Sequence, residues 1–183
     1  MFLALHSYVL AAVALVAAVY QMINHSVFKS LLFFGAGAMD VATGTHDMDR
    51  LGGLIKFLPW ISALFLVGSL SIAALPPFNG FASEWLTFQA LLQSAILPSA
   101  AIKVVFALSG AALALTAGLA VTCFVRAFAM SFLGMPRWEG QPHQPTNVRH
   151  SMRAAMVFLA LLCLILAVFP AYVIDALNGP VTR

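Results

Sequence analysis

A histidine and a lysine stand four residues apart in the first long apolar stretch of the chain. Side chains at positions i and i+4 share one face of a helix, so a helical stretch places His25 and Lys29 together. Histidine titrates near neutral pH, and removal from water disfavours the charged form of lysine. The pair is therefore predicted to pass protons inside the apolar region. The alternative is that it only binds a backbone carbonyl or a neighbouring subunit.

A carboxylate follows a sequence that must interrupt a helix. The run Leu75-Pro76-Pro77-Phe78-Asn79-Gly80 holds two prolines, which lack a backbone N–H and clash with the preceding turn, and Glu84 lies four residues after it. Broken backbone at membrane depth is tolerated where it is buried in protein or lines a wet cavity. Glu84 is therefore predicted to accept protons from a water chain admitted at the break. Alternatively, it caps the N-terminus of its own helix through the helix dipole.

Three other ionisable residues are secondary candidates for proton transfer: Asp40, Lys103 and Arg126. Asp40 either admits protons near the end of the first apolar stretch or is simply an interfacial acid. Lys103 is expected to extend its ammonium group to the membrane interface, or to pair with Glu84 on another helix. Arg126 extends to the interface or faces a polar interior. The histidines expected in solvated loops are His46, His143 and His150.

The composition identifies the environment in which these residues must work. Of 183 residues, 62% are hydrophobic and 8% are charged, against about 25% charged in an ordinary soluble domain. This excludes aqueous monomers, and the net charge of +3 gives no nucleic-acid footprint. Cys123 and Cys163 lie in apolar runs without metal or redox spacing, and no cofactor or metal site is expected.

The apolar segments predict an all-α, polytopic transmembrane protein with about four spans. The expected helical segments are residues 8–43, 59–94, 100–132 and 154–176. The second segment is predicted to cross the membrane once, broken at Leu75–Gly80, because each arm alone is short for a full span of ~20 residues. A re-entrant loop or a hairpin at the two prolines is the alternative.

Basic residues in the loops predict the orientation in the membrane. Loops 44–58 and 133–153 carry most of them: Arg50, Lys56, Arg137, Arg149 and Arg153. Cytoplasmic loops of membrane proteins are enriched in lysine and arginine. Both loops are therefore expected in the cytoplasm, with both termini outside a cell inner membrane.

Several motifs in register resemble one family. The stretch from Asn24 to Gly37, NHSVFKSLLFFGAG, resembles the NHxxFKxLLFLGAG motif of antiporter-like proton-pumping subunits. These subunits occur in complex I, in multisubunit Na⁺/H⁺ antiporters and in membrane-bound hydrogenases. Ala42–Thr45, Leu51–Leu54 and Leu75–Trp85 continue the resemblance in the same order. Cys123–Phe128 and Ser151–Arg153 suit the branch of hydrogenase-4 component B and formate hydrogenlyase subunit 3.

The resemblance implies roles for the residues singled out above. Lys29 corresponds to the central lysine of a half-channel with His25 beside it, and Glu84 to the residue that ends that half-channel towards the outer face. The chain departs from the family at Gln21, where a second histidine is usual and glutamine cannot titrate. Family members are longer and contain two inverted half-channel repeats. Residues 1–183 resemble only the second repeat and the helices after it.

The function implied is proton translocation as part of a redox-driven complex of the hydrogenase or NADH-quinone oxidoreductase type. Partner membrane subunits would carry out electron transfer, since the chain has no redox centre of its own. One alternative is a Na⁺/H⁺ antiporter subunit. Another is a non-conducting subunit or remnant that only packs against its partners.

Overall fold

The computed structural model describes residues 2–93, 99–137 and 148–181, and every regular element within these ranges is helical. This confirms the predicted all-α class. His143 and much of the second loop lie outside the described residues. The elements are α1 (Phe2–Thr43), the 3₁₀-helix η1 (Leu54–Lys56), α2 (Pro59–Ile72), α3 (Asn79–Leu92), α4 (Ala100–Phe132), α5 (His150–Val168) and α6 (Pro170–Val181).

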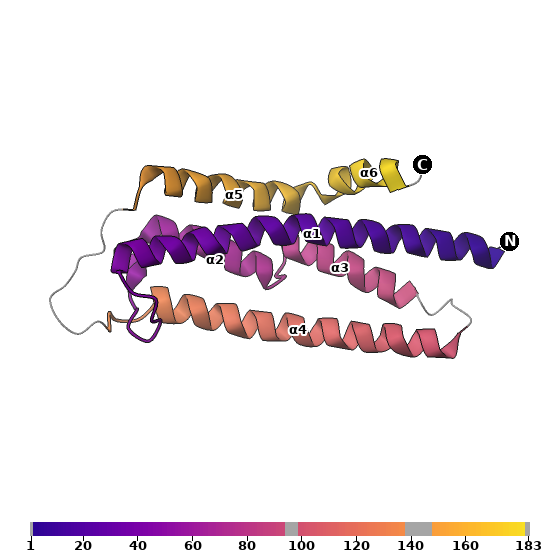
Figure 1. Ribbon diagram of the computed structural model, residues 1–183, viewed down its shortest axis with the longest axis horizontal. Coiled ribbons are helices and arrows are strands. Elements are labelled where there is room, and N and C mark those ends of the chain that lie inside the picture. Colours follow the sequence, from indigo (N-terminus) through magenta and orange to yellow (C-terminus); the bar gives the residue numbers. More distant parts are fainter. Residues whose placement is uncertain (1, 94–98, 138–147, 182–183) are drawn as a thin grey trace.

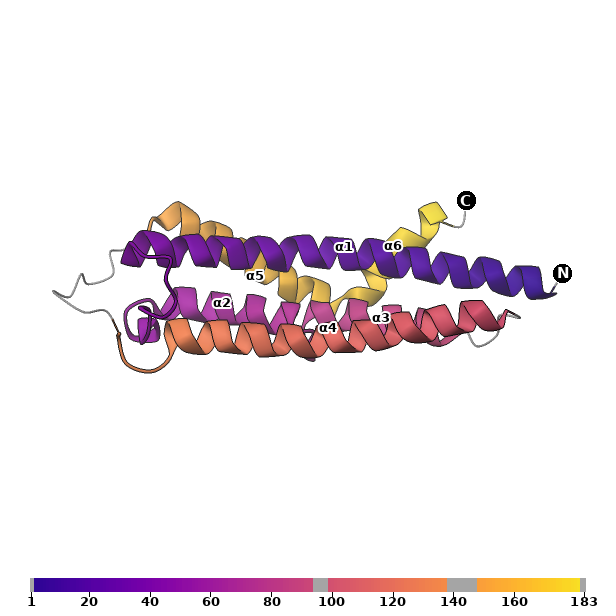
Figure 2. The same ribbon diagram turned by 60° about the horizontal axis from the view of Figure 1, so that its bottom comes forward.

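The helices make four antiparallel passes along one axis (Figure 1). Among the described residues, three helical segments are long and apolar enough to cross a membrane: Tyr8–Thr43, Ala100–Phe132 and His150–Val168. The remaining pass is made by α2 and α3, which run end to end in both views (Figures 1 and 2). The single broken helix is thus confirmed, and the hairpin alternative is wrong. Both ends of the chain lie at the same end of the bundle.

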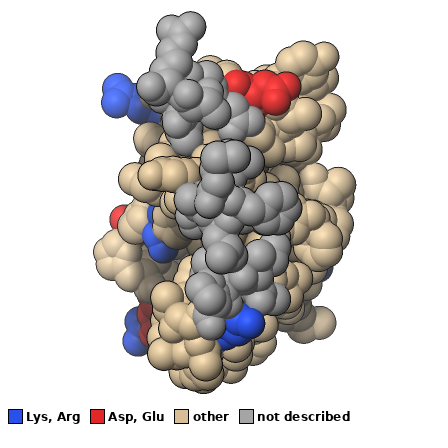
Figure 3. All heavy atoms as spheres, turned by 90° about the vertical axis from the view of Figure 1, so that its right-hand side faces the viewer, with Lys and Arg blue, Asp and Glu red and all other residues tan. Residues whose placement is uncertain are grey.

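The two ends of the bundle differ in what they carry. The ends of α1 and α4 and the start of α5 lie together at one end, which agrees with the prediction that the two loops share one side (Figure 1). Figure 3 shows the opposite end, where much of the described surface in view is uncharged. The basic residues near the connections are Arg50, Lys56, Arg137, Arg149 and Arg153, whereas Lys103 lies near the opposite end, in the first turn of α4.

The fourth pass differs from the single helix expected over residues 154–176. The helix begins earlier, at His150, and α5 ends at Val168 before α6 starts at Pro170. Proline disfavours helical backbone in the residue before it, and Phe169 accordingly has ψ 44°. The Phe169 N–H still donates to the Ile165 carbonyl at 2.9 Å. Pro170 therefore divides a segment whose composition is continuously apolar.

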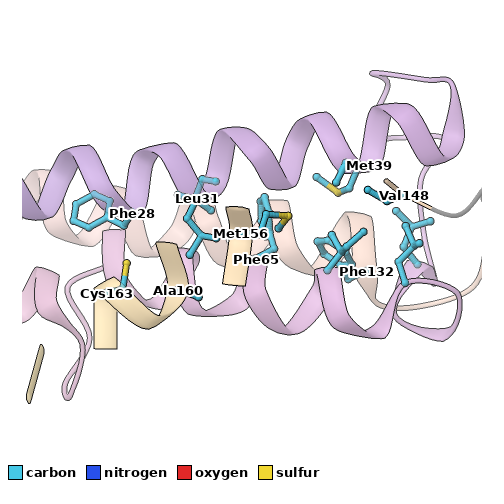
Figure 4. Close-up of a cluster of buried hydrophobic side chains, with 14 of the residues drawn as sticks. Phe28, Leu31, Met39, Phe65, Phe132, Val148, Met156, Ala160 and Cys163 are labelled. Carbon is cyan, nitrogen blue, oxygen red and sulfur yellow. The ribbon is translucent and has the colours of Figure 1, made fainter. Parts of the chain in front are cut away.

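A hydrophobic core holds the passes together around α1 (Figure 4). Phe28 and Leu31 of α1, Phe65 of α2 and Met156 of α5 belong to this cluster, and all four side chains are buried. By contrast, α4 buries only Ser131 and Phe132, at its last turn. The long apolar face of α4 is therefore left for lipid or for another protein.

The break between α2 and α3 is compact, and the two helices approach each other closely there. After α2 the chain enters the left-handed region at Ala74 (φ 50°), and the Leu75 N–H donates to the Leu70 carbonyl at 3.2 Å. Pro76 and Pro77, joined by a cis peptide bond, have no N–H to satisfy. A Cβ atom added to Gly80 would overlap the carbonyl oxygen of Ser71. Glycine at this position therefore lets α3 start directly against the end of α2.

Replacing Gly80 with alanine is expected to destabilise the fold by about 3 kcal/mol, because backbone on both sides of the contact must shift. Thermal unfolding of the purified chain in detergent measures the loss. Gly118→Ala is the matched control, since a Cβ atom there meets nothing within 4 Å and alanine favours helix. Equal unfolding temperatures for the two variants would contradict the close approach at Gly80.

Candidate functional site

A buried cluster of uncharged polar side chains joins the middle of α1 to the first turns of α3. We call it the polar junction; it comprises Gln21, Asn24, Asn79 and Ser83. Asn24, Asn79 and Ser83 are fully buried, and Gln21 is half-buried. The sequence marked Asn79 only as part of the helix break and Gln21 only as a departure from the family. The junction is the centre of the candidate site because its side chains pack between α1 and α3.

Two hydrogen bonds link Asn24 to Asn79. The Asn79 side chain donates through Nδ2 to Oδ1 of Asn24 at 3.1 Å, and Asn24 donates through Nδ2 to the backbone carbonyl of Asn79 at 3.2 Å. A side chain of α1 thereby satisfies a backbone group at the start of α3. Oδ1 of Asn79 is buried and has no hydrogen-bond partner among the described residues. One acceptor at the break is thus left for a water molecule or another subunit.

Ser83 connects the junction to the next polar position on α1. Its hydroxyl has three acceptors in reach: Oε1 of Gln21, the Gly80 carbonyl at 3.1 Å and the Asn79 carbonyl at 3.3 Å. A hydroxyl donates a single hydrogen bond at a time, so these are alternatives. Ser83 can therefore turn between its own helix and Gln21. Sequence reasoning missed this contact, because serine in a helix usually bonds only to its own backbone.

Gln21, His25 and Lys29 form a polar ridge along α1, since they follow one another at intervals of four residues. The structure confirms that His25 and Lys29 share a face, but both side chains are exposed in this chain. The His25 ring lies 5.1 Å from that of Phe28, and Lys29 Nζ lies 5.8 Å from the centre of the Phe33 ring. The ridge thus leads from the buried junction to the outside of the bundle.

Glu84 follows Ser83 on α3 and is half-buried. It is the sixth residue of α3, beyond the first turn, and no side chain caps that helix. This position does not support the capping role. No ion pair joins it to Lys103, whose side chain is exposed on α4; across the described ranges the only pairs are Asp40–His46 and Asp47–Arg50. The structure therefore places Glu84 beside the junction rather than in a salt bridge.

The secondary candidates lie away from the junction. Oδ1 of Asp40 is 3.1 Å from Nδ1 of His46, so His46 is exposed as expected but has a partner. Arg126 is exposed and donates to Sδ of Met130 at 3.4 Å. It lines a surface groove together with Asp47. The structure does not bring Asp40, Lys103 or Arg126 into contact with His25, Lys29 or Glu84.

Arg137, one of the loop cations, has a structural role that the count of loop charges did not indicate. Arg137 donates to three backbone carbonyls: those of Met130 at 2.6 Å, Asp49 at 3.0 Å and Met48 at 3.4 Å. These hydrogen bonds link the connection after α1 to the last turn of α4. His150 is exposed at the start of α5, as expected.

Within the part of the chain that the structure describes, no three histidine, cysteine, aspartate or glutamate side chains form a group that could hold a metal ion. Cys123 is exposed, Cys163 is buried, and neither forms a disulfide.

The fold and the junction define a polytopic membrane subunit with a broken helix at its polar centre, and sequence comparison assigns that class. The chain belongs to the NADH:quinone oxidoreductase/Mrp antiporter transmembrane family, whose model matches residues 1–109. This confirms the resemblance drawn from the motifs. The chain is an antiporter-like membrane subunit of this family.

Two individual relatives show which members of the family the chain is similar to. The chain is 41% identical over 165 residues to hydrogenase-4 component B of Escherichia coli strain K12, covering 90% of this chain and 24% of the relative. It is 37% identical over 179 residues to formate hydrogenlyase subunit 3 of the same strain, covering 98% and 29%. The chain thus spans about a quarter of the length of these two relatives.

A solved structure matches the fold over most of the chain. The Mrp complex from Dietzia sp. DQ12-45-1b superimposes with a TM-score of 0.72 at 20% identity, covering 93% of this chain and 37% of that chain. At this identity the match concerns the fold alone.

The polar junction should contribute measurably to the stability of the fold. In a double-mutant cycle of Asn24→Ala and Asn79→Ala, we expect a coupling energy of about 1 kcal/mol, typical of hydrogen bonds between membrane helices. Unfolding in detergent measures the four stabilities. Ser26→Ala replaces Asn24→Ala in the control cycle, because Ser26 is exposed and bonds only to the Ile23 carbonyl of its own helix. Equal coupling in both cycles would contradict the Asn24–Asn79 bonds.

Proposed function

We propose that this chain carries one proton-conducting half-channel of a larger antiporter-like subunit. The proposal rests on the hydrogen-bonded junction at the broken helix. This junction joins the polar ridge on α1 to the turn of α3 that contains Glu84. Broken backbone at membrane depth marks ion pathways in membrane transporters. Membership of a family that contains proton-pumping complexes supports the same conclusion.

In this proposal, Lys29, His25 and Glu84 exchange protons and the uncharged junction relays them. Lys29 and His25 lie one helical turn apart, and Gln21 lies one turn further along the same ridge. Gln21 and the Ser83 hydroxyl can pass a proton only through hydrogen bonds and water, because neither side chain titrates near neutral pH. Ser83 can switch its acceptor between Gln21 and its own helix, which would open or interrupt the chain of hydrogen bonds.

The exposed ridge supports a larger assembly. Ionisable side chains at membrane depth nearly always face protein or water, because contact with hydrocarbon is costly. We therefore propose that residues 1–183 are part of a proton-conducting domain whose remaining helices cover His25 and Lys29. The partners would be the membrane subunits of a hydrogenase-type or complex I-type assembly, with redox chemistry carried out there. Asp40, Lys103 and Arg126 stay secondary candidates.

Lys29→Ala and Glu84→Gln are each expected to lower proton flux by about tenfold or more, because neither replacement can carry a proton. Flux is measured in membrane vesicles that contain the assembled complex. Lys56→Ala and Asp49→Asn are matched controls that remove one cation and one acid from the exposed loops. Unchanged flux in both site variants would refute a conducting role. Flux that requires Na⁺ would favour cation/proton exchange instead.

We propose that the loops after α1 and α4 face the cytoplasm and that the termini face outward, since five loop cations gather at that end. In a chain with Cys123 replaced by alanine, Met48→Cys should react with a membrane-impermeant maleimide only from the cytoplasmic side. Gln93→Cys, at the other end of the bundle, should react only from outside. Both parent side chains are exposed. The reverse labelling pattern would invert the orientation.

A further inference from the structure

Two arginines and a histidine gather where α5 begins, and the half-channel does not use them. Arg149 precedes the helix, His150 starts it, and Arg153 follows one turn later. Arg149 and His150 are exposed, whereas Nε of Arg153 is buried without a hydrogen-bond partner in the described chain. The two ion pairs of the described residues, Asp40–His46 and Asp47–Arg50, involve neither Arg149 nor Arg153. The described acids therefore form no ion pair with these two arginines.

A groove between α1 and α5 begins at Arg149 and continues along apolar side chains. Arg149 and Ser151 supply its polar part, and its apolar walls are Phe34 and Val41 of α1 and Met152 and Ala155 of α5. Phe34 and Val41 are 41% and 58% exposed. They are seven residues apart, or about 10 Å along the helix. The groove is therefore charged at its mouth and apolar along its length.

The groove lies where a spanning helix leaves the membrane. The segment His150–Val168 is one of the membrane-spanning candidates, and its single arginine, Arg153, lies in its first turn. Phospholipid phosphates lie at this depth, and acyl chains lie immediately below them. Guanidinium groups bind phosphate through paired, charge-assisted hydrogen bonds. A free phosphate ion would leave the apolar walls of the groove unused.

We propose that this groove binds one anionic phospholipid. Its phosphate is held by Arg149 and the Ser151 hydroxyl, Arg153 adds positive charge one turn further along α5, and an acyl chain lies against Phe34 and Val41. The cations match the negative headgroup, and the apolar walls match the chain. The site is independent of proton conduction, because it shares no residue with the polar junction or the ridge.

Lipid retention by the full chain in a non-ionic detergent tests the proposal. Native mass spectrometry counts the bound lipid when phosphatidylglycerol or phosphatidylcholine with the same acyl chains is titrated. We expect one phosphatidylglycerol per chain in preference to phosphatidylcholine. Each cation near a membrane surface contributes about fivefold in affinity, so the double variant Arg149→Gln/Arg153→Gln should bind about 25-fold more weakly. Lys56→Gln, which removes an exposed cation outside the groove, should leave binding unchanged.

A second pair of variants tests the apolar part without altering charge. Ala155→Phe fills the groove and should weaken retention of phosphatidylglycerol, whereas Ala154→Phe, at an exposed position outside it, should not. Circular dichroism confirms that each variant remains helical, and this pair decides the question if the arginine variant does not fold.

Three results would overturn the proposal. Equal retention of the two lipids would show that the headgroup is not recognised. Equal losses from Lys56→Gln and the double variant would reduce the effect to general surface charge. Displacement of the lipid by inorganic phosphate at the same concentration would identify a simple anion site.

Discussion

A lipid bilayer offers no hydrogen-bond partner to a broken helix, and the interruption between α2 and α3 must therefore find its partners within the protein. Between Ala73 and Phe78 the structure meets this constraint on the donor side. The N–H groups of Ala73, Ala74, Leu75 and Phe78 each reach a nearby carbonyl. Pro76 and Pro77 have no N–H to satisfy. An irregular segment is thereby made compatible with membrane depth.

The acceptor side of the break explains why α1 carries an asparagine among apolar residues. Nδ2 of Asn24 satisfies the backbone carbonyl of Asn79, and the Asn79 side chain returns a bond to Asn24. The two helices are thus fixed in register at one level. Since Gln21 lies one turn away on the neighbouring face of α1, the same contact positions the ridge relative to α3. Structure and proposed conduction both rest on these few hydrogen bonds.

Sequence reasoning succeeded where a local chemical rule decides the outcome. The predicted limits of α4, residues 100–132, are those of the structure, and the break follows from the inability of Pro76 and Pro77 to continue a helix. The shared face of His25 and Lys29 follows from helical periodicity alone. These features need no knowledge of packing.

The features that sequence reasoning missed depend on contacts between distant segments. Ser83 and Gln21 are 62 positions apart, and only the packing of α3 on α1 brings them together. Which face of α1 is covered could not be predicted either, because His25, Lys29 and Asn24 are all polar interruptions of one apolar run. The division of the last pass at Pro170 was missed because hydropathy continues through it.

The lengths of two helices bear on the membrane that can accommodate this subunit. The segment Tyr8–Thr43 of α1 has 36 residues and α4 has 33, or about 54 Å and 50 Å of helix, against a hydrocarbon layer of about 30 Å. Even a 40° tilt, the upper end of the usual range, brings 54 Å only to about 41 Å along the membrane normal. Both helices therefore extend past the hydrocarbon layer of an average bilayer. In α4, residues 104–125 lie between Lys103 and Arg126 and span about 33 Å, close to the thickness of that layer.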